Sequence, residues 1–145
     1  MLRTGKLYSR VADTMDWLLE IEEFEEAEDS CNMELDPIGG GRESVVYHEN
    51  GVIVKLNTRE RGEWLPYIKL PCFCHTEIYE APFGLVILQE VLSLDSESFV
   101  ANNVENEIIS CMDASGLPYE RGEISDENVG MNKEGKWKMF DIPIQ

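Results

Sequence analysis

Two short apolar segments joined by Asn50-Gly51 constrain the fold of this chain more than any other feature. Residues 44–48 read S-V-V-Y-H and residues 52–56 read V-I-V-K-L. Asparagine and glycine both tolerate positive φ, which a two-residue hairpin turn requires. Three glycines, at positions 39–41, precede the first segment. The sequence therefore predicts an antiparallel β-hairpin introduced by a flexible glycine segment.

The remaining pattern predicts an α+β fold of helix, strands, helix and hairpin. Residues 9–29 carry apolar side chains along one side, which is typical of an amphipathic helix. An extended segment begins at Pro37, and residues 58–68 are weakly helical. We expect strands at residues 76–79 and 84–90, and the second of these is apolar enough to be buried on both faces.

A second helix and a hairpin complete the expected elements. Residues 96–114 are predicted to form one helix, and Gly116 stands where a helix C-cap glycine belongs. Segments 128–132 and 136–142 are expected to pair across a turn at 133–135. The apolar face of the predicted helix comprises Val100, Val104, Ile108, Ile109 and Met112.

Length and charge limit the class of protein. The 145 residues, 43% of them apolar, are expected to form a single domain, with an acidic helix and linker at 1–36 and a core at 37–145. There is no internal repeat and no apolar run long enough to span a membrane. The net charge of −17 argues against a nucleic-acid partner, because phosphates would be repelled.

The N-terminus indicates a reducing, cytoplasmic location, which determines the expected state of the cysteines. Residues 1–10 lack the apolar core of a secretory signal. The four cysteines, Cys31, Cys72, Cys74 and Cys111, are therefore predicted to be free thiols. The C-x-C-H run at 72–75 is tighter than ordinary structural zinc sites, so buried free cysteines are the preferred interpretation.

Acidic residues are concentrated in one stretch near the N-terminus. Residues 16–36 contain ten Asp or Glu and no Lys or Arg. A solvated helix face that keeps the protein soluble is the favoured interpretation. The alternative is a surface that engages a basic protein partner.

The glycine segment and the return strand together indicate a phosphate site. Gly39, Gly41, Ser44 and Val46 match the pattern G-x-G-x-x-G-x-V, with serine in the place of the third glycine. A glycine-rich turn lets backbone amides approach phosphate oxygens. If Val54 and Leu56 face one side of the sheet, then Lys55 faces the other, beneath the glycine segment. An ordinary strand lysine pointing into water is the alternative.

Three polar residues near the C-terminus have spacings that suit a phosphate-bound cation. Asn128 follows Glu123 by five residues, and Asp141 follows Asn128 by thirteen. The amide oxygen of Asn128 and the carboxylate of Asp141 can share a Mg²⁺ ion, while Glu123 faces an incoming hydroxyl group. The alternative assigns these residues to hairpin caps and a solvated loop acid.

In their order along the chain, these elements resemble the nucleotide-binding part of a protein kinase, over residues 39–143. The resemblance implies a minimal kinase-like core with an antiparallel sheet, a helix and a catalytic-loop hairpin. It implies that Lys55 holds phosphates of ATP and that the segment from Gln89 to Val91 is the hinge that binds adenine. It further implies that Glu123 is catalytic and that Asn128 and Asp141 bind Mg²⁺.

The chain departs from the kinase pattern in several places. Glutamate stands at the catalytic position instead of aspartate, and a misplacement of about 1 Å can lower a rate about 10²-fold. Asp141 is followed by Ile-Pro instead of Phe-Gly, and Ser125 replaces the usual lysine. Most of the helical lobe that binds peptide substrates is lacking. Glu60 and Glu63 are the candidate partners of Lys55.

The sequence leaves three functions open. The first is a minimal kinase that binds ATP and Mg²⁺ and transfers the γ-phosphoryl group to a hydroxyl of a protein or small molecule. The second is a non-catalytic acidic binding protein, of a pseudokinase or phage anti-defence type, that engages a basic partner. The third is a structural remnant that forms a homodimer through a surface lined by Trp64, Tyr67 and Trp137.

Overall fold

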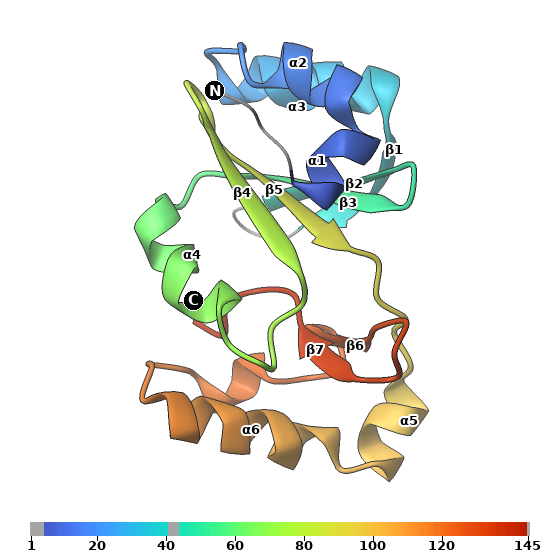
Figure 1. Cartoon of the computed structure of the whole chain (residues 1–145), viewed down its shortest axis with the longest axis vertical. Helices are drawn as coiled ribbons and strands as arrows, with labels where there is room; N and C mark the ends of the chain where they lie inside the picture. Colours follow the sequence, from blue (N-terminus) through green and yellow to red (C-terminus); the bar gives the residue numbers. More distant parts are fainter. Residues whose placement is uncertain (1–4, 41–43, 145) are drawn as a thin grey trace. The chain divides into compact units, whose positions relative to one another are not determined.

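The computed structural model describes residues 5–40 and 44–144, and the chain divides into two compact units (Figure 1). Unit 1 comprises residues 1–63 and 76–91, and unit 2 comprises residues 64–75 and 92–145. The described residues form six α-helices, a five-stranded antiparallel sheet and a two-stranded hairpin, which confirms the predicted α+β class. No helix within those residues has the length and apolarity needed to cross a membrane.

Unit 1 is built on the five-stranded sheet. Its strand order is β1-β2-β3-β5-β4, and every neighbouring pair is antiparallel. Asn50 and Gly51 adopt φ values of 47° and 74°, which confirms the predicted hairpin turn. The helix α4 (Arg61–Ile68) follows β3. The strands are β1 (Asp36–Gly40), β2 (Ser44–Glu49), β3 (Val52–Asn57), β4 (Thr76–Ala81) and β5 (Gly84–Glu90).

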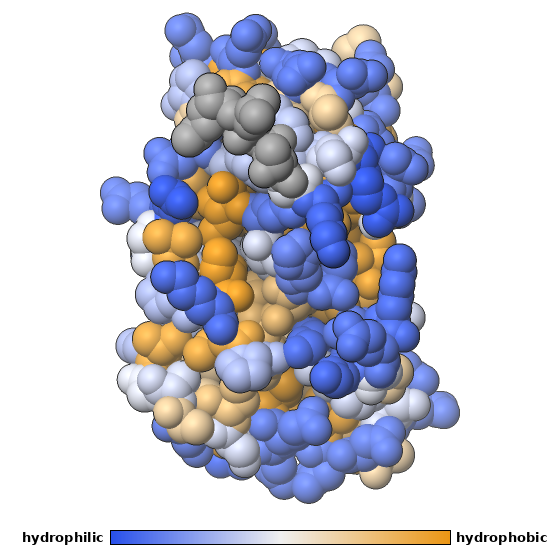
Figure 2. Space-filling view, in the orientation of Figure 1, coloured by the Kyte–Doolittle hydropathy of each residue, from blue (hydrophilic) through white to orange (hydrophobic). Residues whose placement is uncertain are grey.

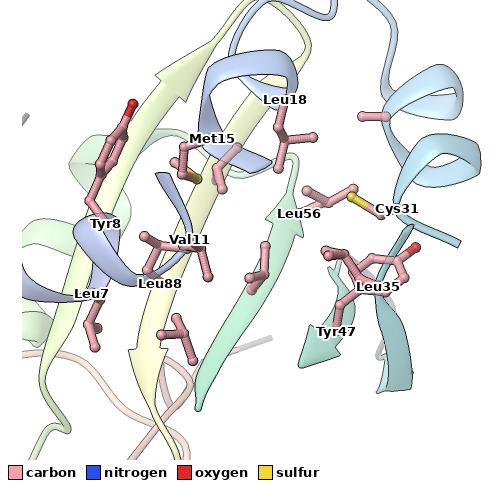
Figure 3. Packing of buried hydrophobic residues seen from close by; sticks show 14 residues of the cluster. Leu7, Tyr8, Val11, Met15, Leu18, Cys31, Leu35, Tyr47, Leu56 and Leu88 are labelled. Atoms are coloured by element: carbon pink, nitrogen blue, oxygen red, sulfur yellow. The ribbon is translucent and has the colours of Figure 1, made fainter. Parts of the chain in front are cut away.

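Three helices supply the apolar side chains that pack against one face of this sheet (Figure 3). Met15 and Leu18 of one helix and Cys31 of another belong to the same buried cluster as Leu56 and Leu88 of the sheet. Alternate residues of a strand point to opposite faces, so this face uses only every second residue of β3 and β5. The helices are α1 (Lys6–Arg10), α2 (Ala12–Leu18) and α3 (Phe24–Glu34).

The predicted single helix over residues 9–29 is wrong. The helical path is interrupted at Val11, where φ is −130°, and again between Leu18 and Phe24. One straight helix would place its apolar residues along a single line. Three short helices can each turn an apolar side toward the sheet, and they therefore bury these residues. The break expected at residues 32–36 comes later, because α3 continues to Glu34.

A carboxylate on the sheet fixes the start of α1. The oxygens of Glu77 on β4 accept hydrogen bonds from the backbone N–H groups of Leu7 and Tyr8, each at 3.0 Å. These two amides are among the first N–H groups of the helix, which have no partner within the helix itself. Glu77 therefore ties the N-terminal helix to the sheet. Its negative charge also interacts favourably with the positive end of the helix dipole.

Unit 2 contains most of α4, two further helices, a 3₁₀ turn and the hairpin. The predicted helix over residues 96–114 is two helices, because Asn103 adopts a left-handed φ of 54° between them. Val100 is consequently 75% exposed instead of lying on the buried face. Gly116 ends the second helix with φ 74°, as predicted. The elements are α5 (Ser96–Ala101), α6 (Val104–Ser115), η1 (Arg121–Glu123), β6 (Val129–Met131) and β7 (Trp137–Met139).

The predicted C-terminal hairpin is confirmed, and single residues extend it on both sides. Met131 of β6 exchanges two backbone hydrogen bonds with Ser93, at 2.8 and 2.9 Å. On the outer side of β7, Phe73 forms an isolated parallel bridge with Met139. Gly130 is required here because a Cβ atom at this position would lie 2.8 Å from the Cβ of Leu92.

A disulfide joins Cys72 to Cys111 across 39 residues, so the prediction of four free thiols is wrong for these two. Cys31 and Cys74 remain buried thiols outside any disulfide, as predicted. The pairing arises because segment 72–74 lies beside β7 while α6 also packs against β7, which no sequence spacing reveals. The prediction of four free thiols depends on the expected reducing, cytoplasmic location, and that location stays an untested prediction.

Candidate functional site

Four side chains predicted to contact a nucleotide project from the face of the unit 1 sheet opposite the helical core: Ser44, Val46, Lys55 and Gln89. Gly39, Val46 and Lys55 are direct neighbours in register across β1, β2 and β3. Residues that lie opposite each other on antiparallel strands project to the same face. The sheet therefore brings Val46 and Lys55 together beside the backbone of Gly39.

Lys55 is buried on this face. Its neighbours Val54 and Leu56 point into the helical core, which confirms the predicted alternation. Lys55 is only 4% exposed, so the alternative interpretation of a strand lysine pointing into water is wrong. Lysines are almost never buried this deeply unless a partner compensates their charge.

The two glutamates predicted to pair with Lys55 make other contacts in the structure. Glu60 and Glu63 are both exposed. A carboxylate oxygen of Glu63 lies 4.0 Å from the guanidinium of Arg59, and the other accepts a hydrogen bond from the backbone of Glu60. The assignment of either residue to Lys55 stays a prediction.

Polar side chains surround the lysine on the same face. Gln89, opposite Ile53 on β3, is 1% exposed, and its amide donates a 3.2 Å hydrogen bond to the hydroxyl of Thr76. Gln89 therefore lies within β5 as a buried side chain, while Val91 follows the strand and is 39% exposed. Gly41 lies outside the described residues.

The sequence interpretation missed Asn57. This side chain is 2% exposed and donates a 2.5 Å hydrogen bond to the hydroxyl of Ser44, the residue opposite it on β2. The oxygen of the same amide accepts a 2.7 Å bond from the backbone of Arg59. The two-residue period of β3 could have identified it, because Asn57 lies on the same face as Lys55.

The other three candidates lie close together within unit 2. Asn128 donates a 2.8 Å hydrogen bond from its side-chain amide to the backbone carbonyl of Glu123. The backbone carbonyl of Asn128 accepts a 3.2 Å bond from the N–H of Phe140, directly before Asp141. Asn128 therefore bridges the turn that carries Glu123 and the strand end that carries Asp141.

The hairpin register explains why Asn128 and Asp141 lie at the same end of the hairpin. Val129 pairs with Met139, so the residues just outside this pair lie at the open end of the hairpin. One oxygen of Asp141 accepts a 2.9 Å bond from the N–H of Ile142. This bond orients the carboxylate. The capping alternative is correct in one respect, since Asn128 does close the turn, and its amide oxygen is a possible cation ligand as well.

This end of the hairpin supplies few protein ligands to a cation, so Mg²⁺ or Mn²⁺ would bind there weakly by itself and more tightly with further ligands. Within residues 5–40 and 44–144, no group of three or more His, Cys, Asp or Glu side chains could hold a metal ion. One carboxylate and one amide oxygen supply two ligands at most in a monodentate arrangement. Mg²⁺ is commonly held in this way, by one or two carboxylates together with phosphates of the substrate.

Comparison with known proteins gives no match: no family model, no curated protein and no solved structure matches this chain.

Proposed function

We propose that this protein is a minimal kinase-like protein that binds ATP and Mg²⁺ and transfers the γ-phosphoryl group to a hydroxyl. The observation that carries the proposal is the row of Gly39, Val46 and Lys55 on the sheet face opposite the helical core. A glycine-rich segment before β2 and a buried lysine on β3 are the phosphate-binding parts of protein kinases.

We assign nucleotide binding to unit 1. Residues 52–55 read V-I-V-K, which is similar to the V-A-I-K segment of kinases that carries the phosphate-binding lysine. The same face carries one partly buried aliphatic side chain, Val46, in register with the lysine. A purine base packs well on aliphatic side chains, while the ammonium group neutralises phosphate charge. The exposed segment at Val91 is assigned to the base through its backbone groups.

We assign binding of the cation and orientation of the acceptor hydroxyl to unit 2. Asn128 and Asp141 at the open end of the hairpin would hold Mg²⁺, which bridges phosphate oxygens and neutralises the charge that develops during transfer. Glu123, whose backbone is bonded to Asn128, would orient or deprotonate the acceptor. Because the side chain of glutamate is longer than that of aspartate, we expect slow transfer.

Calorimetric titration tests the proposal most directly. We expect the native chain to bind ATP with Mg²⁺ and to bind ATP more weakly with excess chelator. Lys55→Met keeps most of the aliphatic stem of a buried side chain and removes its charge, so it should lower ATP affinity at least tenfold. Asp141→Asn should lower the affinity for the Mg²⁺ complex and leave binding of metal-free ATP nearly unchanged.

Matched controls separate these effects from general changes of charge. Lys136→Met removes an exposed lysine in the hairpin turn, and Asp126→Asn removes a carboxylate near Asn128 but outside the candidate set. Both controls should bind ATP like the native chain. Absence of ATP binding by the folded native chain would refute the proposal. ATP binding without formation of ADP in the presence of varied hydroxyl acceptors would leave a nucleotide-binding pseudokinase.

The exposure of the acidic stretch supports a second candidate function, a non-catalytic protein that engages a basic partner. Of the ten acids in residues 16–36, all but Glu28 are exposed. Figure 2 shows hydrophilic side chains at the end of unit 1 that carries α2 and α3, as over much of this face of the molecule. An uncompensated cluster of charge attracts opposite charge over about one Debye length, which is about 8 Å at physiological salt.

Charge reversal distinguishes a binding face from a solvated one. We would replace Glu22, Glu25 and Glu26 by lysine and measure binding of poly-lysine at several salt concentrations. The control reverses an equal number of exposed acids in unit 2: Glu107, Glu120 and Glu127. A specific acidic face predicts a larger loss for the first set. Equal losses would mean that poly-lysine responds only to net charge.

A further inference from the structure

We propose that the Cys72–Cys111 disulfide is a redox-controlled clamp that positions Asp141 at the open end of the β6–β7 hairpin. All the residues of this clamp belong to unit 2. The inference rests on the proposed function only for the cation that Asp141 is assigned to hold. The clamp itself is argued from hydrogen bonds and from one covalent bond.

Segment 71–74 holds the outer side of β7. The N–H of Met139 donates a 2.7 Å bond to the carbonyl of Cys72, and the N–H of Cys74 donates a 2.8 Å bond to the carbonyl of Met139. The ammonium group of the neighbouring Lys138 donates to the carbonyl of Pro71. Three bonds to one short segment therefore determine where β7 ends.

The disulfide anchors this segment to a second element. Cys111 belongs to α6, and α6 packs against β7, so the covalent bond closes a ring that runs through segment 72–74, the helix and the strand. Without the bond, the segment is held by its hydrogen bonds and by packing that includes the edge-to-face contact of Phe73 with Trp64. Strand pairing through a single residue is weak by itself. The disulfide therefore contributes much of the stability with which this segment is held against β7.

Asp141 lies between this anchor and another. It follows Met139 by two residues, and on its other side the carbonyl of Pro143 accepts a 2.7 Å bond from the N–H of Glu120. The bond from Ile142 N–H to the Asp141 carboxylate exists only while the backbone keeps this course. Release of the first anchor should therefore let the strand end fray and the carboxylate turn.

The redox step needs a dithiol reductant, of the small-molecule or protein class. One thiolate of the reductant attacks a disulfide sulfur and forms a mixed disulfide, and its second thiolate then displaces the protein sulfur. Two electrons and two protons pass to Cys72 and Cys111, and the reductant becomes a disulfide. Cys111 is only partly buried, which gives the reductant a sulfur to approach.

Hydrogen exchange resolved by NMR tests the clamp without any metal or nucleotide. Addition of dithiothreitol to the native chain should speed exchange of the Met139, Phe140 and Ile142 amides by about tenfold or more. Amides of Val54 and Leu88 in the unit 1 sheet should change less than twofold. Cys111→Ala should show the fast rates without reductant and should not respond to it.

A cysteine in the same segment provides the matched control. Cys74→Ala removes a buried thiol beside Met139 but leaves the disulfide intact, so its exchange rates should still respond to dithiothreitol. Equal rates with and without reductant in the native chain would overturn the clamp. An equal rise in unit 1 would also overturn it, because the disulfide would then act only on global stability.

Titration with Mn²⁺ separates the clamp from the proposed function. We expect the oxidised chain to bind Mn²⁺ at least threefold more tightly than the reduced chain. If neither form binds Mn²⁺ while exchange still responds to the reductant, the clamp stands and the cation role of Asp141 fails. If Mn²⁺ binds equally to both forms, Asp141 is not positioned by the disulfide and the proposal is refuted.

Discussion

The side-chain amide of Asn128 donates a 2.8 Å hydrogen bond to the backbone carbonyl of Glu123, five residues earlier in the chain. One side chain thus serves two purposes in this unit. Its nitrogen closes the turn that begins at η1, and its oxygen is assigned to a cation. The two ends of the amide can be separated by substitution, because aspartate replaces only the nitrogen, whereas alanine removes both the nitrogen and the oxygen.

Asn128→Asp and Asn128→Ala should separate stability from cation binding. Aspartate keeps an oxygen ligand but loses the donor to the Glu123 carbonyl, so we expect a loss of about 1–3 kcal/mol in the free energy of unfolding. Mn²⁺ binding should survive in this variant. Alanine should abolish Mn²⁺ binding and cost a similar free energy. Urea unfolding and a Mn²⁺ titration measure both effects, and loss of Mn²⁺ binding in the aspartate variant would contradict the assignment.

The two faces of the sheet should respond differently to truncation. Leu56 is fully buried against the helices, so Leu56→Ala should lower the free energy of unfolding by about 2–5 kcal/mol. Val46 is only partly buried, on the face of Lys55. Val46→Ala should cost about 1 kcal/mol or less and should weaken ATP binding. Denaturant unfolding and ATP titration check both variants, and an unchanged ATP affinity in Val46→Ala would remove Val46 from the site.

Thiol counting checks the covalent structure. The unfolded chain without reductant should show two reactive thiols, and the unfolded, reduced chain should show four. The folded chain should react slowly, because burial first and the charge of Glu49 second raise the pKa of Cys31 to about 12. At pH 8 the thiolate, which is the reactive form, is then only about one part in ten thousand. Four reactive thiols in the unfolded, unreduced chain would contradict the disulfide.

Alkaline pH should destabilise unit 1 through Cys31. Its pKa is about 12 in the folded chain and ordinarily 9.0, so the unfolded chain loses this proton first. The stabilising contribution is complete below pH 9 and is lost as the pH rises from 9 toward 12. Burial similarly raises the pKa of Tyr47 from 10.0 to about 12. The melting temperature should therefore fall above pH 9, and the slope should be flatter in Cys31→Ala. An identical slope would exclude Cys31 as the cause.

Local features of this fold could be predicted because neighbouring residues alone determine them. Asn50 and Gly51 adopt positive φ, Gly116 ends α6 in a left-handed conformation, and residues 84–90 form a buried strand. The breaks at Val11 and Asn103 could not be predicted in the same way. At both points the apolar spacing continues as in a helix, and packing of separate short helices outweighs that local preference.

The same distinction between local features and features that depend on packing applies to the candidate site. Alternation along β3 is enough to predict that Lys55 points away from Val54 and Leu56, but it does not reveal that the lysine is buried or that Asn57 is bonded to Ser44. In unit 2, the hairpin itself could be predicted, but the sequence pattern predicts Asn128 and Asp141 within its paired segments, whereas the structure places both just outside β6 and β7. The bond from Asn128 to the Glu123 carbonyl depends on the course of the turn, which spacing alone does not define.

The sequence by itself determined the strands, the turns and the order in which polar residues follow them, because these depend on interactions a few residues apart. Only the tertiary structure decided which cysteines pair, where the helices break and how deeply Lys55 lies. Those features join residues that are far apart in the chain, such as Cys72 and Cys111. Contacts of that kind follow from the packing of whole elements, whose free energy no short window of sequence contains.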